Sequence, residues 1–351
     1  MKVKMAFLSK PFDLKIQDVE LGMPKGKQVL IKLKACGICG SDVEIYEGKS
    51  AEGRYDIAPF TPGHEWAGEI TAIGEDVSEF QVGDLVTGDC VHHCGVCENC
   101  RNGLMPSACL NFKESGFHPG APGGMGEYMV NDERYLYKLP KDMDPEIGAW
   151  VEPFSIAMFN LWGNGGCVSA YDDVVVFGAG PIGICATMIA KTANARTIMI
   201  DPLESRRDFA LRYGADCAID PTQESWKKQI NDFTCGKGPS IIVEASGNDT
   251  AIASIWDIAA HSAQVRLTGH SAGRLIPVEL GLTNWKTLNI TGAGGTKDIG
   301  LKTIKFMSRI MDKFDFRGLI SHRFKFQDID KAIDVACYQK SNAMKVMLKF
   351  D

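Results

Sequence analysis

Four cysteines stand close together in the stretch CGVCENCRNGLMPSAC. Thiolates at such short spacings on a polar loop can hold a zinc ion in a closed tetrahedral site, which leaves no position open for a substrate. The spacing therefore predicts a structural zinc held by Cys94, Cys97, Cys100 and Cys109. Cys90, His92 and His93 lie near enough in the sequence to replace one of the four.

A second group of possible zinc ligands is spread widely along the chain. Its members are Cys39 in CGICGSD, His64 and Glu65 in TPGHEWAG, and Glu152 in VEPF. Thiolate, imidazole and carboxylate groups are all ordinary zinc ligands, but only a fold can bring residues so far apart together. A site of this kind with an open position could do chemistry. The simpler interpretation of TPGHEWAG is a turn that leads into a strand.

The stretch VVVFGAGPIGICA carries glycines in the G-x-G-x-x-G spacing, after an apolar strand pattern and at the start of a helix pattern. Such glycines allow a tight turn and the approach of a pyrophosphate to the helix N-terminus. The next strand pattern ends in Asp201, whose carboxylate can accept hydrogen bonds from a ribose and would repel a 2′-phosphate. This order predicts NAD rather than NADP, with Arg206 flanking the adenosine. The expected cofactor-binding residues are Gly178, Gly180, Pro181, Ile182, Gly183, Asp201 and Arg206. A glycine turn without any dinucleotide is the alternative.

The first third of the chain has the pattern of a small β-barrel. Strands are expected at 28–40, 66–74 and 82–89, and glycines, prolines and aspartates interrupt the region at short intervals. From about residue 155 the pattern changes to apolar runs that alternate with helices, which is typical of a doubly wound parallel sheet. We expect this second domain over 156–291. The remainder, 292–351, is expected to hold helices and a closing strand in AMKVMLKF that could return to the first domain.

The composition fits a soluble globular protein of two domains. The chain has 351 residues, of which 45% are hydrophobic and 23% charged, and its net charge of −6 argues against nucleic acid as a partner. The N-terminus lacks a secretory signal pattern and no apolar run is long enough to cross a membrane, so we expect a cytoplasmic protein. In that compartment its twelve cysteines favour metal binding over disulfides.

The sequence resembles the zinc-dependent medium-chain dehydrogenases over essentially its whole length. The motifs that carry the resemblance are CGICGSD, PGHEWAGEI, VGDLV, the cysteine cluster, VEP, GAGPIG and KVML. Within the family the chain is most similar to the polyol branch of sorbitol, galactitol-phosphate and threonine dehydrogenases. The distinguishing residue is Glu152, where classical alcohol dehydrogenases carry a cysteine.

The resemblance implies an α/β protein with a GroES-like β-barrel catalytic domain over 1–155, completed by 292–351, and a Rossmann NAD-binding domain over 156–291. It implies two zinc ions per subunit and a homodimer or homotetramer. Cys39, His64 and Glu65 would hold the catalytic zinc, with Glu152 as a nearby or exchanging ligand.

The reaction that the resemblance implies is hydride transfer to NAD from a secondary alcohol of a polyol, sugar alcohol or sugar-alcohol phosphate. The product would be a ketone or ketose. Ser41 would take the hydroxyl proton, and the alternative, compatible with this role, is a helix N-cap. Glu44 stands where many members have a proton-relaying histidine. Lys49, Arg54 and Lys345 either bind a substrate phosphate or have structural or solvated roles.

Three other functions compete with this hypothesis. One is a threonine- or butanediol-type dehydrogenase of the same family. Another is a regulatory protein that binds zinc and NAD without catalysis, which the presence of all the expected site residues disfavours. A zinc-ribbon nucleic-acid binder is disfavoured by the acidic charge.

Overall fold

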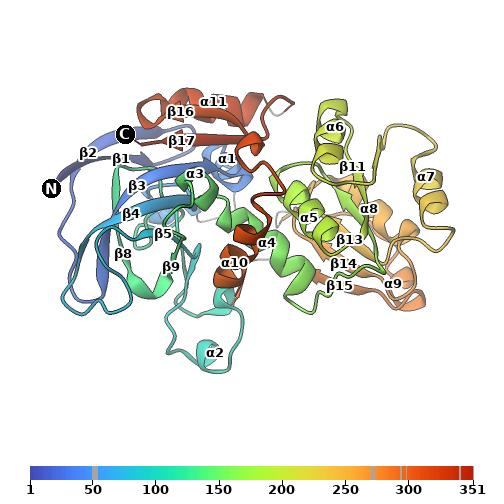
Figure 1. Cartoon of the computed structure of the whole chain (residues 1–351), viewed down its shortest axis with the longest axis horizontal. Coiled ribbons are helices and arrows are strands. Elements are labelled where there is room, and N and C mark those ends of the chain that lie inside the picture. Colours follow the sequence, from blue (N-terminus) through green and yellow to red (C-terminus); the bar gives the residue numbers. More distant parts are fainter. Residues whose placement is uncertain (50–53, 270–272, 293–294, 298, 340, 351) are drawn as a thin grey trace. The chain divides into compact units, whose positions relative to one another are not determined.

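The chain forms two compact units, seen in Figure 1. The computed structural model describes residues 1–49, 54–269, 273–292, 295–297, 299–339 and 341–350. Unit 1 comprises Met1–Glu152 together with Gly295–Asp351, and unit 2 comprises Pro153–Gly294. Helix α4 (Val151–Trp162) carries the chain from the first unit into the second.

Unit 1 is built mainly from strands. Its strands are β1 (Lys2–Leu8), β2 (Leu14–Glu20), β3 (Gln28–Ile38), β4 (Glu65–Ile73), β5 (Leu85–Gly88), β6 (Val91–His92), β7 (Lys113–Glu114), β8 (Tyr128–Asp132), β9 (Leu136–Lys138), β16 (Ile320–Lys325) and β17 (Lys345–Lys349). Its helices are α1 (Gly40–Tyr46), α2 (Glu98–Arg101), α3 (Pro145–Gly148), α10 (Gly300–Ile310) and α11 (Ile329–Tyr338).

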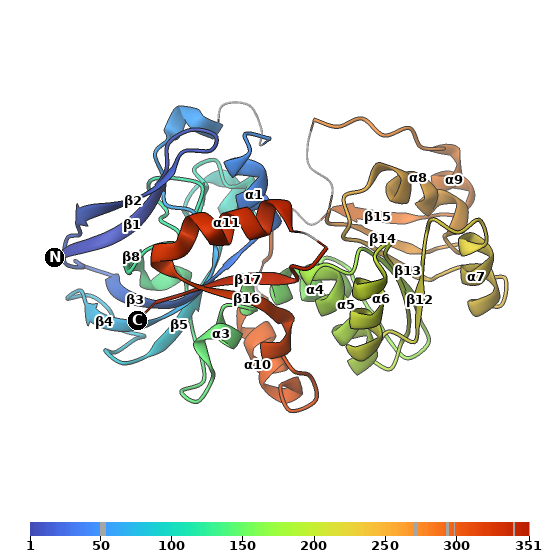
Figure 2. The same ribbon diagram turned by 90° about the horizontal axis from the view of Figure 1, so that it is seen from above.

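The main sheet of unit 1 joins the two ends of the chain. Its order is β16-β17-β3-β4-β5-β9, with β8 pairing to β3 off this path. Strand β17 runs antiparallel to β3, and Val346 lies opposite Ile38 in this register. Figure 2 shows α11 lying along β16 and β17. The segment after unit 2 is therefore part of the same sheet as the N-terminal strands.

The core of unit 1 follows the alternation in the sequence of β3. Val29, Ile31 and Leu33 are fully buried, whereas Lys32 and Lys34 between and after them are half-buried. Period-two alternation places one set of side chains on the core face of a sheet. The expected strand is confirmed, and it ends at Ile38, one residue before the candidate metal ligand Cys39.

Unit 2 alternates strands with helices. Its strands are β10 (Asp173–Phe177), β11 (Arg196–Ile200), β12 (Cys217–Ile219), β13 (Ile241–Glu244), β14 (Gln264–Leu267) and β15 (Asn289–Gly292). Its helices, after α4, are α5 (Pro181–Thr192), α6 (Glu204–Arg212), α7 (Trp226–Phe233), α8 (Asp249–Ile258) and α9 (Gly281–Trp285).

The sheet of unit 2 is parallel, with the order β12-β11-β10-β13-β14-β15. Residues 174–176 of β10 are all fully buried, as expected for a strand with helices over both faces. In Figure 2, α5 and α6 cover one face while α8 and α9 cover the other. The strand order reverses between β10 and β13, and ligands of such sheets bind at the carboxyl ends of the strands near this point.

Across the described ranges, the structure contains no helix with the length and apolar character required to span a membrane.

Candidate metal centres and cofactor site

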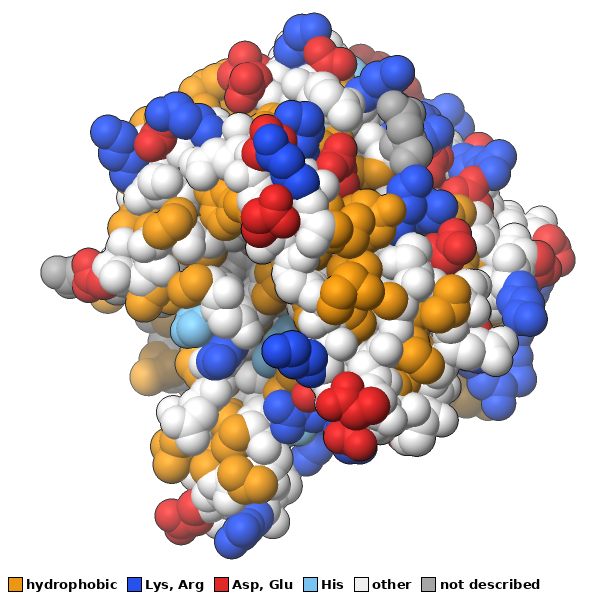
Figure 3. Space-filling view, turned by 90° about the vertical axis from the view of Figure 1, so that its left-hand side faces the viewer, with side chains coloured by type: hydrophobic (Ala, Val, Ile, Leu, Met, Phe, Trp, Pro, Cys, Tyr) orange, Lys and Arg blue, Asp and Glu red, His pale blue; other side chains and the backbone are white. Residues whose placement is uncertain are grey.

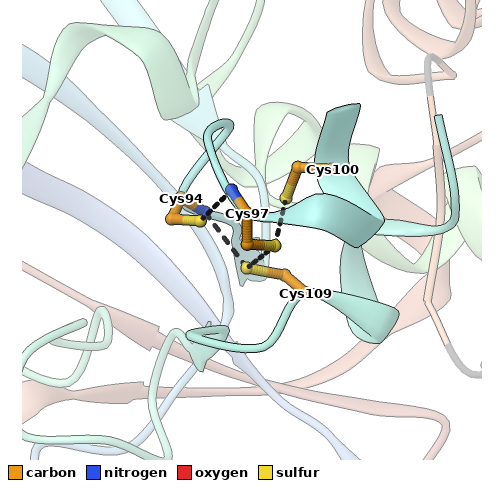
Figure 4. A group of neighbouring side chains, drawn as sticks. All are labelled: Cys94, Cys97, Cys100 and Cys109. Carbon is orange, nitrogen blue, oxygen red and sulfur yellow. Dashed lines mark hydrogen bonds between the residues drawn. The ribbon is translucent and has the colours of Figure 1, made fainter. Parts of the chain in front are cut away.

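The four clustered cysteines meet on the lobe of unit 1 that carries α2. Cys94, Cys97, Cys100 and Cys109 each offer a sulfur, and these four atoms lie within 4.8 Å of one another (Figure 4). The Cys97 sulfur is 3.4 Å from that of Cys100 and 3.9 Å from that of Cys109. Sulfurs that converge in this way from closely spaced loop positions fit a tetrahedral zinc site.

Backbone amides around the cluster favour ionised sulfur. The N–H groups of Val96 and Cys97 donate to the Cys94 sulfur and lower the pKa of that thiol to about 6. In contrast, burial and the neighbouring Cys97 raise the pKa of Cys100 to about 12. Because four thiolates cannot share so small a space without a compensating cation, the donor set fits a bound zinc.

The alternative residues near the cluster take other positions. The His92 ring stacks on Tyr135 with 3.9 Å between centroids, and the Tyr135 hydroxyl donates to the carbonyl of His93. The Cys90 thiol hydrogen-bonds Glu152 instead. None of these three residues belongs to the group of converging ligands that the described chain forms here.

The lobe itself carries exposed apolar side chains. Figure 3 shows hydrophobic side chains on the part that protrudes at the bottom of that view. The large hydrophobic residues exposed on the loop are Val96, Leu104, Leu110 and Phe112. A loop that exposes so much apolar surface gains little from burial, so a central metal ion would have to supply most of its stability.

The second group of ligand types also comes together, at the point where β3 ends and β4 begins. Cys39 follows β3 and is the N-cap of α1, whereas Glu65 opens β4 opposite Gly37 of β3. Cys39, His64 and Glu65 offer ligand atoms that all lie within 4.8 Å of one another. Antiparallel pairing of β3 with β4 thus brings together two segments that are far apart in the sequence.

Asp42 orients both of these segments and was not anticipated from the sequence. Its buried carboxylate accepts hydrogen bonds from the backbone N–H of Cys39 at 2.9 Å and of Gly63 at 3.2 Å. It also lies 3.8 Å from Nδ1 of His64. The signal available in the sequence is an acid at the third position of the helix after Cys39, which is a capping position.

The environment of His64 fits a metal ligand. Its ring is buried against Phe117, and Nδ1 has no hydrogen-bond partner in the described part of the chain. Burial disfavours the charged ring, but the negative charges of Asp42 and Cys39 outweigh it and raise the pKa of His64 well above its ordinary value. A buried, unpaired ring nitrogen beside negative groups is a suitable place for a cation.

Glu65 is paired with a lysine from the far end of the chain. Nζ of Lys345 lies 2.7 Å from Oε1 and 2.5 Å from Oε2 of Glu65, and both side chains are buried. The Glu65 charge raises the pKa of Lys345 despite the opposing effect of burial. A buried ammonium is therefore the direct ion-pair partner of a candidate zinc ligand.

Glu152 lies close to this group without joining it. Its carboxyl group hydrogen-bonds the Cys90 thiol, and its negative charge contributes to the raised pKa values of His64 and Lys345. Burial raises the pKa of Glu152 to about 7, and the charge of Glu65 adds to the increase.

The alternative interpretation of Ser41, as a helix N-cap, is wrong, because Cys39 occupies the N-cap of α1 and Gly40 the first helical position. Ser41 is exposed in the first turn, and Glu44 follows one turn later on the same helix face. Lys49 pairs with Glu47 at 2.7 Å. Residues 50–53 and the Arg54 side chain lie outside the described part of the structure, so the interpretation of Arg54 as a phosphate ligand stays a prediction.

The glycine motif forms the turn between β10 and α5. Gly178 has φ of +92°, a conformation that favours glycine, and Gly180 is the N-cap of α5. At Gly183 a side chain would collide with the carbonyl oxygen of Gly178. The turn therefore packs closely against the helix and points the free N–H groups of α5 toward the carboxyl edge of the sheet.

Asp201 holds this turn from the neighbouring strand. Its Oδ2 accepts a hydrogen bond from the N–H of Ala179 at 2.9 Å, and its Oδ1 accepts one from Leu203 at 2.9 Å. Each oxygen keeps a second lone pair for a further donor. The Arg206 guanidinium lies about 4.0 Å from the position a Cβ of Gly180 would take, so a cation flanks the turn.

Comparison with known proteins identifies the family of the chain. Residues 25–141 match the family model of the alcohol dehydrogenase GroES-like domain, and residues 181–309 match that of the zinc-binding dehydrogenases. L-threonine 3-dehydrogenase of Deinococcus deserti is 30% identical over 341 residues, which cover 95% of each chain. The chain belongs to the zinc-binding dehydrogenase family.

Solved structures of other dehydrogenases share the fold of this chain. RspB of Escherichia coli CFT073, solved with NADH, superposes with a TM-score of 0.89 at 31% identity and covers 99% of both chains. The 2R,3R-butanediol dehydrogenase of Bacillus subtilis superposes with a TM-score of 0.86 at 25% identity, again over 99% of both chains. The predicted resemblance and the α/β class with a GroES-like domain and a parallel nucleotide-binding sheet are confirmed. The prediction of an NAD-dependent zinc-containing dehydrogenase is also confirmed at the level of the family.

Proposed function

We propose that this dehydrogenase oxidises a secondary alcohol of a polyol, a sugar alcohol or its phosphate to the ketone, with NAD as hydride acceptor. One observation carries the proposal. Cys39, His64 and Glu65 converge within 4.8 Å in a buried setting that also holds the polar groups of Glu152 and Lys345. Buried polar groups around a metal suit a substrate that has several hydroxyls to donate and accept hydrogen bonds.

Each of the converging residues has a distinct task in this proposal. Cys39, His64 and Glu65 hold the catalytic zinc, Asp42 fixes the loops that carry the first two, and Lys345 forms an ion pair with Glu65. Cys94, Cys97, Cys100 and Cys109 hold the structural zinc. When bound, zinc supplies polarisation of the alcohol oxygen and NAD supplies the hydride acceptor.

The hydroxyl proton leaves through α1. Ser41 accepts it from the substrate and passes it toward solvent, and Glu44 extends the path because residues three apart share a helix face. The exposure of Ser41 supports this role, since a relay that ends in solvent needs a solvated group.

The cofactor lies at the carboxyl edge of the unit 2 sheet. The glycine turn receives the pyrophosphate at the N-terminus of α5, and Asp201 accepts a ribose hydroxyl. The buried Asp201 carboxylate would repel a 2′-phosphate, which supports NAD over NADP.

A second candidate substrate is an amino alcohol or a simple vicinal diol. The relatives named L-threonine 3-dehydrogenase and 2R,3R-butanediol dehydrogenase support it. Reduced-nicotinamide absorbance should be followed with sugar alcohols, their phosphates, cyclitols, threonine and butanediol. A signal confined to sugar alcohols or their phosphates is expected. A signal confined to threonine or butanediol would replace the polyol proposal with the second candidate.

A further inference from the structure

A buried carboxylate lies at the carboxyl edge of the unit 2 sheet, where β13 ends. Glu244 is the last residue of β13 and is fully buried. Within the described residues it forms no ion pair with a lysine or arginine. A buried charge without a cation is costly, and it persists only where hydrogen bonds or a function compensate.

One oxygen of Glu244 organises the turn that follows β13. Oε1 accepts hydrogen bonds from the backbone N–H of Ser246 at 2.9 Å, from its hydroxyl at 2.5 Å, and from the N–H of Gly247 at 3.0 Å. These donors fold residues 245–247 back over the end of their own strand. The shape of this turn therefore depends on a single carboxylate oxygen.

The backbone of the same residue reaches the loop after β14. Its carbonyl oxygen accepts hydrogen bonds from the N–H groups of Thr268 at 2.9 Å and Gly269 at 3.1 Å. At Gly247 a side chain would collide with the carbonyl oxygen of Gly269. The turns after β13 and β14 are thus packed backbone to backbone, with Glu244 between them.

The turn after β13 also forms a wall of the glycine turn. A Cβ on Gly178 would lie 2.9 Å from Cα of Ser246 and 3.0 Å from the carbonyl oxygen of Ala245. The N–H of Ala245 donates to the carbonyl of Phe177, directly before Gly178. A shift of residues 245–247 would therefore change the space available beside the glycine turn.

The second oxygen of Glu244 has no structural use in the described chain. Oε2 is buried without a hydrogen-bond partner, and a Cβ on Gly269 would lie 2.9 Å from it. Buried carboxylate oxygens are normally hydrogen-bonded. The fold of the turn uses only Oε1, so the turn by itself does not explain why a full carboxylate is buried at this position.

We propose that Glu244 is a positioning residue for the dinucleotide. It holds the turns after β10, β13 and β14 in the arrangement that receives NAD, and this inference rests on the proposed cofactor site at Gly178. A purely structural role would affect stability but not cofactor affinity, so the two roles can be separated by measuring both.

The test is the dissociation constant of NADH for the full-length Glu244→Gln variant, measured by nicotinamide fluorescence. Glutamine has nearly the same shape, but it lacks the charge that strengthens the three hydrogen bonds to Oε1. We expect the Kd for NADH and the KM for NAD to rise about tenfold, with kcat at saturating NAD changed by less than about twofold. An unchanged Kd would overturn the proposal.

Glu133→Gln is the matched control. Glu133 is also a buried carboxylate that accepts two loop N–H groups, from Ser78 and Glu79, but it belongs to unit 1. We expect this variant to lose stability and to keep the Kd for NADH within about twofold of the wild type. If Glu133→Gln weakens NADH binding as much as Glu244→Gln does, the effect is general destabilisation and the proposal is wrong.

Ser246→Ala covers the possibility that Glu244→Gln does not fold. It removes the hydroxyl that donates to Oε1 and that also accepts a hydrogen bond from the N–H of Asn248. It keeps both backbone donors to Oε1, and we expect the Kd for NADH to rise about threefold. A Kd equal to that of the wild type would then count against the proposal. If wild-type protein itself fails to bind NADH, the proposed function is wrong and this inference falls with it. If wild type binds and both variants bind equally well, only the role of Glu244 is refuted.

Discussion

Glu65 and Lys345 form a buried ion pair across 280 positions of sequence, with both carboxylate oxygens within 2.7 Å of the ammonium. Strand β17 places the lysine beside β3, and β4 places the glutamate on the other side of β3. The pair therefore depends on the return of the C-terminal segment to the N-terminal sheet. The ion-pair partner of a proposed zinc ligand is thus supplied by the C-terminal segment.

Lys345→Met should destabilise unit 1 strongly. Removing the cation leaves the Glu65 carboxylate buried and unpaired, which costs about 3–5 kcal/mol of unfolding free energy. The matched control is Lys349→Met, on the same strand. The Lys349 side chain is 55% exposed and pairs with Glu146 at 3.4 Å, so its loss should cost under about 1 kcal/mol. Urea unfolding of both variants measures the two changes in unfolding free energy. Equal losses of unfolding free energy in the two variants would refute the importance of the buried pair.

Cys97→Ser should remove the structural zinc. With one of its four sulfurs replaced, the lobe should lose roughly one equivalent of zinc per chain and several kcal/mol of stability. Cys235→Ser, at an exposed cysteine of unit 2, should change neither quantity. Metal analysis and thermal unfolding measure the two effects. Full zinc content in Cys97→Ser would rule out the four-cysteine site.

Asp201→Asn should weaken the preference for NAD over NADP. Asparagine still offers an oxygen to Ala179 or Leu203, but it no longer repels a 2′-phosphate. We expect the ratio of kcat/KM for NAD to that for NADP to fall at least about tenfold. Asp220→Asn is the control, because Asp220 directly follows β12 as Asp201 follows β11. The assignment of Asp201 fails if both variants keep the wild-type ratio.

Ser41→Ala should lose most of its turnover while keeping its fold. Loss of a proton relay lowers kcat by about 100-fold or more, and an exposed serine in a helix contributes little stability. Ser41→Thr keeps the hydroxyl and should retain most activity. Steady-state kinetics with saturating NAD would measure both. Near-normal kcat in the alanine variant would remove Ser41 from the mechanism.

The lowered pKa of Glu133 predicts that the unfolding free energy of the protein depends on pH. Burial opposes its charge, but the N–H groups of Ser78 and Glu79 and the ammonium of Lys27 outweigh burial and lower its pKa below the ordinary value of 4.5. A carboxyl whose folded-state pKa is lowered stabilises the fold above the unfolded-state pKa, and this contribution is lost as the pH falls through the folded-state value.

The wild type should therefore exceed Glu133→Gln in unfolding free energy by about 1–3 kcal/mol at neutral pH. The difference should shrink as the pH falls below about 4.5. Glu69→Gln, which loses only a surface pair with Lys34, should differ from the wild type by under about 1 kcal/mol. Chemical unfolding at several pH values would show this, and a difference that persists at low pH would contradict it.

Features with a local sequence pattern could be predicted. Strand β3, the glycine turn at Gly178 and the cysteine cluster each depend on residues close together in the chain, and each forms as expected. Physical rules for alternation, left-handed turns and metal-ligand spacing act over such short distances.

Pairings across the fold could not be predicted from patterns. Asp42 holds Gly63, Lys345 neutralises Glu65, and the Cys90 thiol bonds Glu152, and each pair joins distant segments. Only the family resemblance brought Cys39, His64 and Glu65 together in advance. The alternative of Ser41 as an N-cap is wrong because Cys39, a residue type that caps helices less often, already occupies the N-cap of α1.

The most direct test of the central claim is NAD-dependent alcohol oxidation by the wild type and by Cys39→Ser, with zinc content measured on the same samples. Cys39→Ser should contain roughly one zinc per chain instead of two, bind NADH normally and have no measurable turnover. The wild type should lose its turnover in a chelator and recover it with added zinc. Undiminished oxidation by Cys39→Ser, or by wild type shown to be free of zinc, would contradict the account.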